Sequence, residues 1–206
     1  MKLTNSIAGV MALALAWQAP AAAQACAALK TPAAGSWAEY QTENGNMRLA
    51  LLGSEARAGK TFLRMEMSMT TKDGPAILQM LVPGYPYEMS AIEDLVMKAG
   101  NQPAMRMSAQ MIGMMRSRMP KDAIAEACRS TRMTRVGEES VTVPAGTFPA
   151  VHYHDPESKN DVWVSESVPF GLIKVHPAGG ADIVLTGKGT DAKSRITETP
   201  MEMPGM

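Results

Sequence analysis

The sequence predicts an α+β domain in which an antiparallel sheet, built from both halves of the chain, encloses a helical insertion at residues 90–128. Two observations lead to this prediction. Apolar and polar residues alternate in short segments, separated by turn residues, on both sides of the insertion. Between these segments, apolar residues recur at helical spacing. We therefore expect a single folded domain at residues 36–198, a length usual for one domain.

The first half predicts four strands joined by tight turns, which is typical of an antiparallel meander. The third strand is the clearest, because its apolar residues share one face and its polar residues share the other. The apolar face carries Leu63, Met65, Met67 and Met69. We expect the four strands at residues 37–40, 47–52, 63–69 and 76–82.

The insertion contains the apolar residues that recur at helical spacing. Residues 108–119 predict a helix that ends at Pro120, and residues 122–128 predict a second, short helix that begins with an acidic residue. Residues 89–98 are compatible with a helix or with a strand followed by a bend, and both alternatives stay open.

The second half predicts further strands, at residues 139–143, 148–154, 161–164, 172–176, 182–190 and 194–197. Pairing of His154 with Asp161 places His152 opposite Trp163 and sorts the apolar residues of both strands to the other face, so we prefer this register. Glycines within residues 186–190 predict a bend or bulge. Residues 199–206 lack a core-forming pattern, so we expect a disordered tail.

The N-terminal segment predicts export. Lys2 precedes an apolar run at residues 7–17, and small residues follow as far as Ala25; these are the parts of a secretory signal peptide, here residues 1–25. The run is shorter than the ~20 residues of a membrane-spanning helix. We expect cleavage after Ala23 or Ala25, and a periplasmic or secreted protein whose mature chain has no transmembrane segment.

Cys26 and Cys128 are the two cysteines of the chain. In an oxidising compartment they are a candidate disulfide, which would close a long loop and stabilise the fold by roughly 4 kcal/mol. Two alternatives stay open, namely free thiols and lipidation of Cys26 after cleavage at Ala25. The residues that precede Cys26 fit a lipoprotein signal poorly, which favours the bridge over a lipid anchor.

The charge balance excludes one class of partner. The chain has 20 Lys and Arg against 20 Asp and Glu, so it offers no basic surplus to a nucleic-acid backbone. A basic stretch at residues 116–135 is compatible with peripheral contact to anionic lipid headgroups. The sequence contains no nucleophile-elbow, zinc-protease or phosphate-loop motif. We therefore expect a non-enzymatic protein without a cofactor.

Segments of both halves resemble a known superfamily. They read SWAEYQ, MRLALLGSE and GKTFLRMEM in the first half, and VGEESVTVPAGTFPAVHYH, DVWVSESVPFGLIKV and LTGKGTDAKSRIT in the second. They are similar to uncharacterised exported bacterial domains related to the LolA/LolB lipoprotein carriers. The resemblance implies a strongly curved sheet, an unclosed half-barrel with helices on its concave side. It also implies a lipid or lipoprotein acyl chain as the ligand, and it carries over no individual site residue.

Methionine-rich segments indicate where an apolar ligand would bind. The chain has 19 methionines among 206 residues, and unbranched thioethers can repack around ligands of varied shape. The candidate pocket residues are Leu63, Met65, Met67, Met69, Leu78, Met80, Met111, Met114 and Met115.

Two alternatives to this function stay open. The methionines would fill the interior completely in a structural or interaction module that has no ligand. A copper-binding protein would use Met65, Met67 and Met69, with Met105, Met107 or Met111 as further ligands, since thioethers suit Cu(I). Alternate residues of one strand lie about 6.5–7 Å apart, so such a site would need further ligands from the insertion. His152 and His154 are a weaker candidate for a zinc or copper site.

Overall fold

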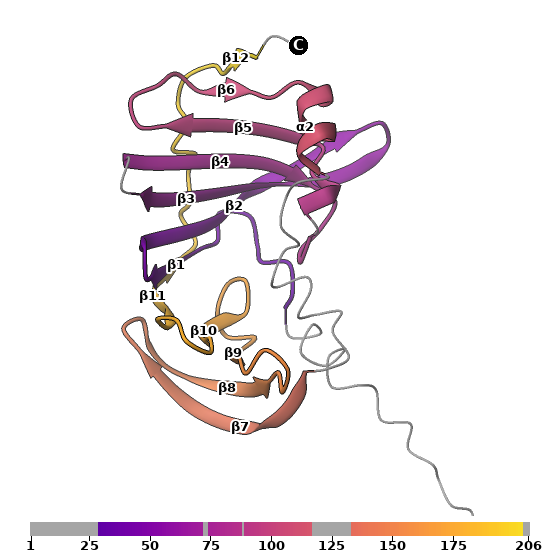
Figure 1. The fold of residues 1–206 in the computed structure, drawn as a ribbon. Coiled ribbons are helices and arrows are strands. Elements are labelled where there is room, and N and C mark those ends of the chain that lie inside the picture. Colours follow the sequence, from indigo (N-terminus) through magenta and orange to yellow (C-terminus); the bar gives the residue numbers. More distant parts are fainter. Residues whose placement is uncertain (1–28, 72–73, 88, 117–132, 204–206) are drawn as a thin grey trace, which may run out of the picture.

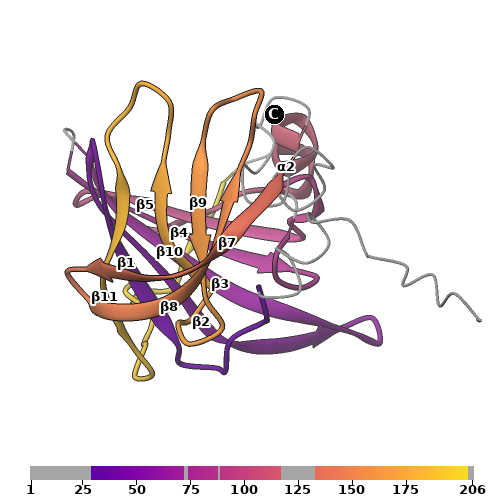
Figure 2. The same cartoon turned by 90° about the horizontal axis from the view of Figure 1, so that it is seen from below.

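A computed structural model of the chain describes residues 29–71, 74–87, 89–116 and 133–203. Within these residues twelve strands form one sheet, in the order β12-β6-β5-β4-β3-β2-β1-β11-β10-β9-β8-β7. Neighbouring strands are antiparallel, except β6 and β12. The sheet curves strongly and leaves β7 and β12 as its two edges (Figures 1 and 2). The predicted curved, unclosed antiparallel sheet is therefore confirmed.

The described elements follow the predicted strands closely. The strands are β1 (Trp37–Thr42), β2 (Gly45–Arg57), β3 (Lys60–Thr71), β4 (Gly74–Val82), β5 (Asp94–Ala99), β6 (Met105–Arg106), β7 (Thr134–Val143), β8 (Gly146–His154), β9 (Asp161–Val164), β10 (Leu172–His176), β11 (Ile183–Gly189) and β12 (Met201–Glu202). Helical structure in the described residues consists of the 3-10 turn η1 (Met89–Ala91) and α2 (Ala109–Arg116). Residues 194–197 form no strand, although their pattern predicts one.

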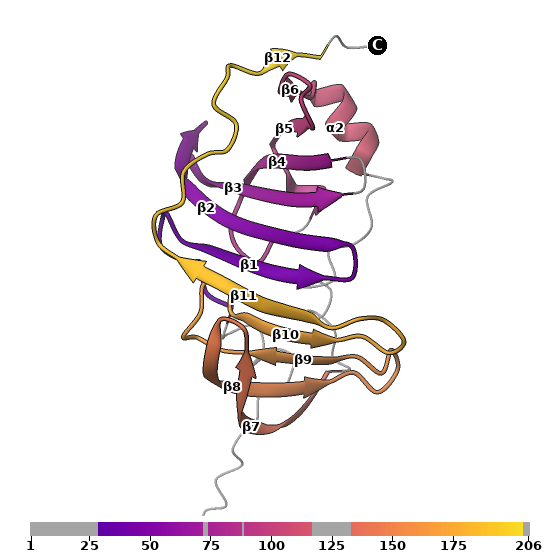
Figure 3. The same ribbon diagram turned by 90° about the vertical axis from the view of Figure 1, so that its left-hand side faces the viewer.

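Alternation along the strands gives β2–β5 two distinct faces. Met65 of β3 lies opposite Met80 of β4, and both belong to the main hydrophobic core. Glu66 and Gln79, which also lie opposite each other, occupy the other face. Ile112 of α2 packs into the main core, so we call the first face the helix face. The C-terminal segment crosses the second face (Figure 3), which we call the strap face.

The helical insertion is much smaller than predicted. Asp94–Ala99 is strand β5, which extends the sheet beside β4. Of the two alternatives for residues 89–98 the structure therefore shows the strand, and the prediction of a helical insertion that spans residues 90–128 is wrong for this part. Leu95 and Met97 alternate with Val96 and Lys98, a period of two that is hard to recognise in six residues. Helix α2 lies within the helix predicted at residues 108–119.

Strand β11 joins the two halves of the sheet. It pairs with β1, and Gly189 lies opposite Trp37. A Cβ atom at Gly189 would lie 2.6 Å from Trp37 Nε1, so the indole packs where only a glycine leaves room. The register shifts between Glu39 and Tyr40 of β1, opposite the bend or bulge predicted at residues 186–190.

The predicted register of β8 and β9 is confirmed. His154 lies opposite Asp161, and His152 lies opposite Trp163. The residues between them, including the buried Tyr153, face the other side of the sheet and form a second, smaller core. The sorting of apolar residues to one side of the sheet therefore predicts this register correctly.

A strap made of residues 190–203 crosses the strap face of β1–β6 (Figure 3). Its anchor is Glu66, which is 1% exposed. The Glu66 carboxylate accepts hydrogen bonds from the backbone N–H of Arg195 at 3.0 Å, the Ser194 hydroxyl at 3.3 Å and the Gln79 side-chain amide at 3.0 Å. A carboxylate of the sheet thereby holds the backbone of the strap.

The end of the strap forms the outermost strand of the sheet. Met201 and Glu202 are β12, which pairs in parallel with β6, and the Met201 N–H donates to the Ala104 carbonyl at 2.8 Å. These residues lie in the segment for which the sequence predicts disorder. Pairing with the edge of the sheet orders them, and their own sequence contains no signal of that pairing.

Several sequence-based predictions lie outside the described residues. They concern the signal peptide at residues 1–25, the candidate disulfide of Cys26 and Cys128, the helix at residues 122–128 and the side chain of Met115. In the part of the chain that the structure does describe, no helix combines the length and the hydropathy that crossing a membrane requires.

Candidate functional site

The candidate pocket residues gather on the helix face. They come from β3 (Leu63, Met65, Met67 and Met69), β4 (Leu78 and Met80) and α2 (Met111 and Met114). Most of them belong to the main core or pack against it, namely Leu63, Met65, Met67, Leu78, Met80 and Met111. The structure thus brings together residues that are far apart in the sequence.

Burial divides these residues into two groups. Met65 and Met80 are each 1% exposed, so they serve as packing residues with no free surface. Met67 and Leu78 pack against the core but remain partly exposed. Met114 of α2 is 44% exposed. An apolar surface that is only partly covered therefore extends along β3 and β4.

The residues of the copper alternative lie in two separate places. Met65, Met67 and Met69 alternate along β3, and Met65 is buried. His152 and His154 lie on β8, which is several strands away from β3 in the sheet. The five residues therefore do not form a single site.

Asp161 holds both histidines of β8. Its Oδ1 atom accepts hydrogen bonds from His152 Nε2 at 2.6 Å and from His154 Nδ1 at 3.0 Å. His152 also stacks on Trp163, with ring centroids 4.4 Å apart. Burial raises the pKa of Asp161, but the two hydrogen bonds outweigh it and hold this pKa below its ordinary value. Among the described residues, no group of three or more His, Cys, Asp or Glu side chains could hold a metal ion.

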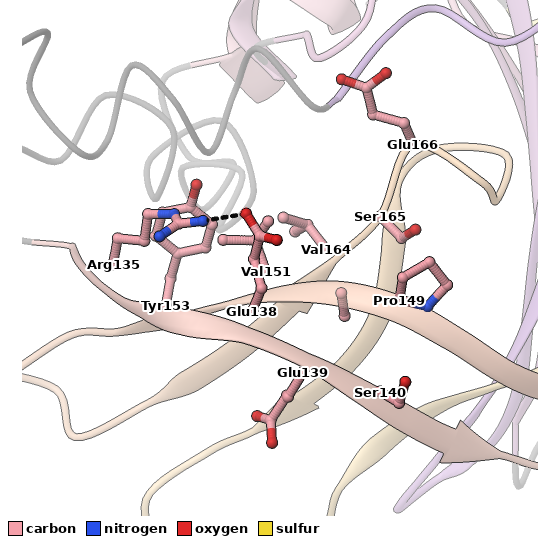
Figure 4. Close-up of a pocket in the computed structure, with 11 residues that line it drawn as sticks. Arg135, Glu138, Glu139, Ser140, Pro149, Val151, Tyr153, Val164, Ser165 and Glu166 are labelled. Atoms are coloured by element: carbon pink, nitrogen blue, oxygen red, sulfur yellow. Dashed lines mark hydrogen bonds and ion pairs between the residues drawn. The ribbon is translucent and has the colours of Figure 1, made fainter.

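A separate hollow of about 620 Å³ opens beside β7, β8 and the end of β9. Its lining consists of Arg135, Glu138, Glu139, Ser140, Pro149, Ala150, Val151, Tyr153, Val164, Ser165 and Glu166. Figure 4 shows Arg135, Glu138 and Tyr153 pointing to one side of these strands and Glu139 to the other. Of these residues the sequence indicates only Arg135 for a ligand, as part of the basic stretch at residues 116–135. No local pattern reveals which residues of three strands border one hollow.

The floor of this hollow is apolar and its rim is charged. Tyr153 belongs to the second core, and burial raises the pKa of its hydroxyl. On the rim, Arg135 pairs with Glu138 at 2.5 Å and Lys30 pairs with Glu166 at 2.6 Å. Because these charged groups pair with one another within the protein, we interpret their role as structural.

Arginines surround Asp94 on the strap face. This nearly buried carboxylate forms ion pairs with Arg57 at 3.5 Å, Arg64 at 3.7 Å and Arg106 at 3.3 Å. The three arginines belong to β2, β3 and β6, and Asp94 begins β5. The cluster therefore connects four strands. Its three guanidinium groups all pair with one carboxylate of the protein itself, that of Asp94.

Solved structures similar to this chain share little sequence identity with it. No family model and no curated protein matches the chain. One similar solved structure is described as a "putative lipoprotein" from Parabacteroides distasonis; it is 12% identical, with a TM-score of 0.36, and the match covers 78% of this chain and 98% of that one. Another, from Bacteroides fragilis, is described as a "putative exported protein with YmcC-like fold"; it is 8% identical, with the same TM-score of 0.36 and the same coverage of 78% and 98%. Neither description mentions the LolA/LolB superfamily, and similarity this low supports no argument about this chain.

Proposed function

We propose that this chain is an exported, non-enzymatic protein that binds an apolar ligand, a lipid or an acyl chain, on its helix face. The observation that carries the proposal is the incomplete burial of that face. Met67, Leu78, Met97 and Met111 pack against the main core but stay partly exposed. The N-terminal signal pattern of residues 1–25 supports the exported location.

The chemistry of the surface suits a flexible apolar chain. Methionine side chains have three rotatable bonds and no branch, so they can adjust to different chain lengths and positions. Burial of an acyl chain contributes ~0.8 kcal/mol per methylene. Twelve methylenes therefore contribute roughly 10 kcal/mol before the costs of association, and a micromolar affinity needs about 8 kcal/mol.

The test begins with the protein purified from an exporting bacterial host. Native mass spectrometry followed by lipid extraction should detect a co-purified lipid, and fluorescent fatty acids should bind with micromolar affinity. The variant Met67→Trp adds bulk to the partly exposed surface and should weaken binding at least ~10-fold, which corresponds to the loss of about two methylene contacts.

A matched control places the same side chain elsewhere. Val136 of the edge strand β7 is 59% exposed, so Val136→Trp should leave the affinity unchanged. Far-UV circular dichroism should show both variants folded. A protein that carries no lipid and binds no fatty acid would leave the alternative of a structural or interaction module. Equal effects of the two variants would place any binding away from the helix face.

A further inference from the structure

Methionines lie opposite methionines across neighbouring strands. Met65 is paired with Met80 between β3 and β4, and Met47 with Met69 between β2 and β3. At the edge of the sheet the pairing extends over three strands. Met105 of β6 lies opposite Met97 of β5 on one side and Met201 of β12 on the other. We call these three residues the methionine ladder.

Ion pairs establish which face the ladder occupies. Arg106 pairs with Glu202 at 3.4 Å and with Asp94 at 3.3 Å, so all three charged residues lie on the strap face. Met105 and Met201 each precede one of these residues by one position, and side chains alternate along a strand. Both methionines therefore point to the helix face, where Met97 lies with them as the direct partner of Met105.

Exposure distinguishes the ladder from the Met65–Met80 pair, and its third methionine distinguishes it from the partly exposed Met47–Met69 pair. Met65 and Met80 are buried at 1% exposure each, and no ion reaches their sulfur atoms without opening the core. Met201 is 52% exposed, and Met97 and Met105 are partly exposed. Strands β5, β6 and β12 lie together at one edge of the sheet (Figures 1 and 3). The ladder thus offers three accessible thioethers at this edge.

The spacing allows the three sulfur atoms to meet. Neighbouring strands lie about 5 Å apart, whether parallel or antiparallel, which is closer than the 6.5–7 Å between alternate residues of one strand. Each side chain extends through three rotatable bonds. The outer two can therefore lean toward a point above Met105, which the alternating methionines of β3 alone cannot do.

We propose that Met97, Met105 and Met201 form a binding site for Cu(I). Thioethers are soft, uncharged ligands that favour Cu(I), whereas Mg²⁺ and Ca²⁺ require oxygen ligands. A thioether carries no proton to release, so binding stays independent of pH across the range where the protein is folded. The site holds the ion through its sulfur atoms alone and involves no redox step. It goes beyond the proposed binding of an apolar ligand, because it binds a metal ion at the sheet edge and needs no lipid; Met97 borders both surfaces.

The experiment is an anaerobic titration of the full chain with Cu(I), in competition with a chromophoric Cu(I) chelator. The wild-type protein should bind one ion with submicromolar affinity, and X-ray absorption should show a first shell of sulfur only. Met105→Leu removes the central ligand and should lower the affinity at least ~100-fold, because even the loss of an indirect partner of a metal site costs 10–100-fold. Leucine keeps the volume of methionine, so circular dichroism should show an unchanged fold.

Two controls use the other methionine pairs. Met65→Leu changes a buried pair, and Met69→Leu changes the strand whose alternating methionines are the copper ligands predicted from the sequence. Both variants should keep the Cu(I) affinity within ~3-fold of wild type. Loss of binding in Met69→Leu with retention in Met105→Leu would overturn the proposal in favour of β3. A wild-type protein that fails to compete for Cu(I), or a first shell that contains nitrogen or oxygen, would also overturn it.

Discussion

Replacing Glu66 by alanine tests how the strap is held. The Glu66 side chain is 1% exposed and accepts hydrogen bonds from Gln79, the Ser194 hydroxyl and the Arg195 backbone N–H. Arg195 also donates from its guanidinium to Ser68 at 2.9 Å. Glu66→Ala removes the acceptor of the Gln79 amide and of the Arg195 backbone N–H, whereas the Ser194 hydroxyl can still donate to the Ile196 carbonyl.

The hydrogen bonds of Glu66 determine how much the variant lowers the free energy of unfolding. A buried donor that loses its partner costs about 1–3 kcal/mol, and the lower value applies here because Gln79 and Ser194 also contact each other, at 2.5 Å. The Ser194 hydroxyl keeps the Ile196 carbonyl as an acceptor at 2.7 Å. The two other donors, at about 1 kcal/mol each, therefore predict a loss of about 2 kcal/mol in the free energy of unfolding. The exposed ion pair farther along the strap provides the contrast. Glu202, whose side chain is 70% exposed, pairs with Arg106, and such pairs contribute about 0–1 kcal/mol.

The assay is urea unfolding followed by tryptophan fluorescence, with Glu202→Ala as the control. Trp37 donates to Asp191 at 2.7 Å at the start of the strap, so its emission also reports on local release. Hydrogen exchange measured by mass spectrometry should show faster exchange over residues 191–203 in Glu66→Ala and unchanged protection in β2–β4 if the strap opens by itself. A cost below ~1 kcal/mol, equal to that of the Glu202 variant, would refute the assignment of Glu66 as the anchor.

Two further predictions concern packing and acid stability. Gly189→Ala should cost ~1–3 kcal/mol in the same assay, because its Cβ would lie 2.6 Å from Trp37 Nε1. Gly137→Ala, which has nothing within 4 Å of the new Cβ, should change the free energy by less than ~1 kcal/mol, and equal costs would contradict the packing argument. Burial raises the pKa of Asp161, but its hydrogen bonds to His152 and His154 hold this pKa below the ordinary value. The resulting stabilisation is complete above the unfolded-state pKa of about 4 and is lost as the pH falls through the lower pKa of the folded state. The melting temperature of Asp161→Asn should therefore fall less steeply than that of wild type below pH ~4, and parallel curves would count against this pairing.

The strands could be predicted from the sequence wherever alternation lasts long enough. Residues 63–69 of β3 repeat the pattern three times, and the register of β8 and β9 follows from the sorting of apolar residues around His154 and Asp161. Strand β5 has six residues, too few to separate a period of two from a helical period. The strap could not be predicted, because its order depends on Glu66, which is more than a hundred residues away in the sequence.

The sequence predicted which residue types make up the candidate site, but it did not predict how those residues are arranged in the sheet. The abundance of methionine indicated an adaptable apolar surface, and most of the candidate residues do gather at the main core. Which methionines are buried and which lie at an edge depends on strand order and register. The sequence did not indicate Met97 or Met201 as site residues, because Met97 falls in the predicted helical insertion and Met201 falls in the predicted disordered tail.

The pairing of β1 with β11 determines at which stage of folding the sheet can be completed. Trp37 and Asp191, joined by a hydrogen bond, are 154 residues apart, whereas β2, β3 and β4 pair with immediate neighbours in the sequence. The local hairpins can therefore form early during folding, whereas the pairing of β1 with β11 requires nearly the whole chain to be present. Sheets rich in such distant pairings fold in milliseconds to seconds. A chain that stops before β11 would leave two half-sheets with unpaired edges and an uncovered apolar face, which is the kind of surface on which partly folded chains aggregate.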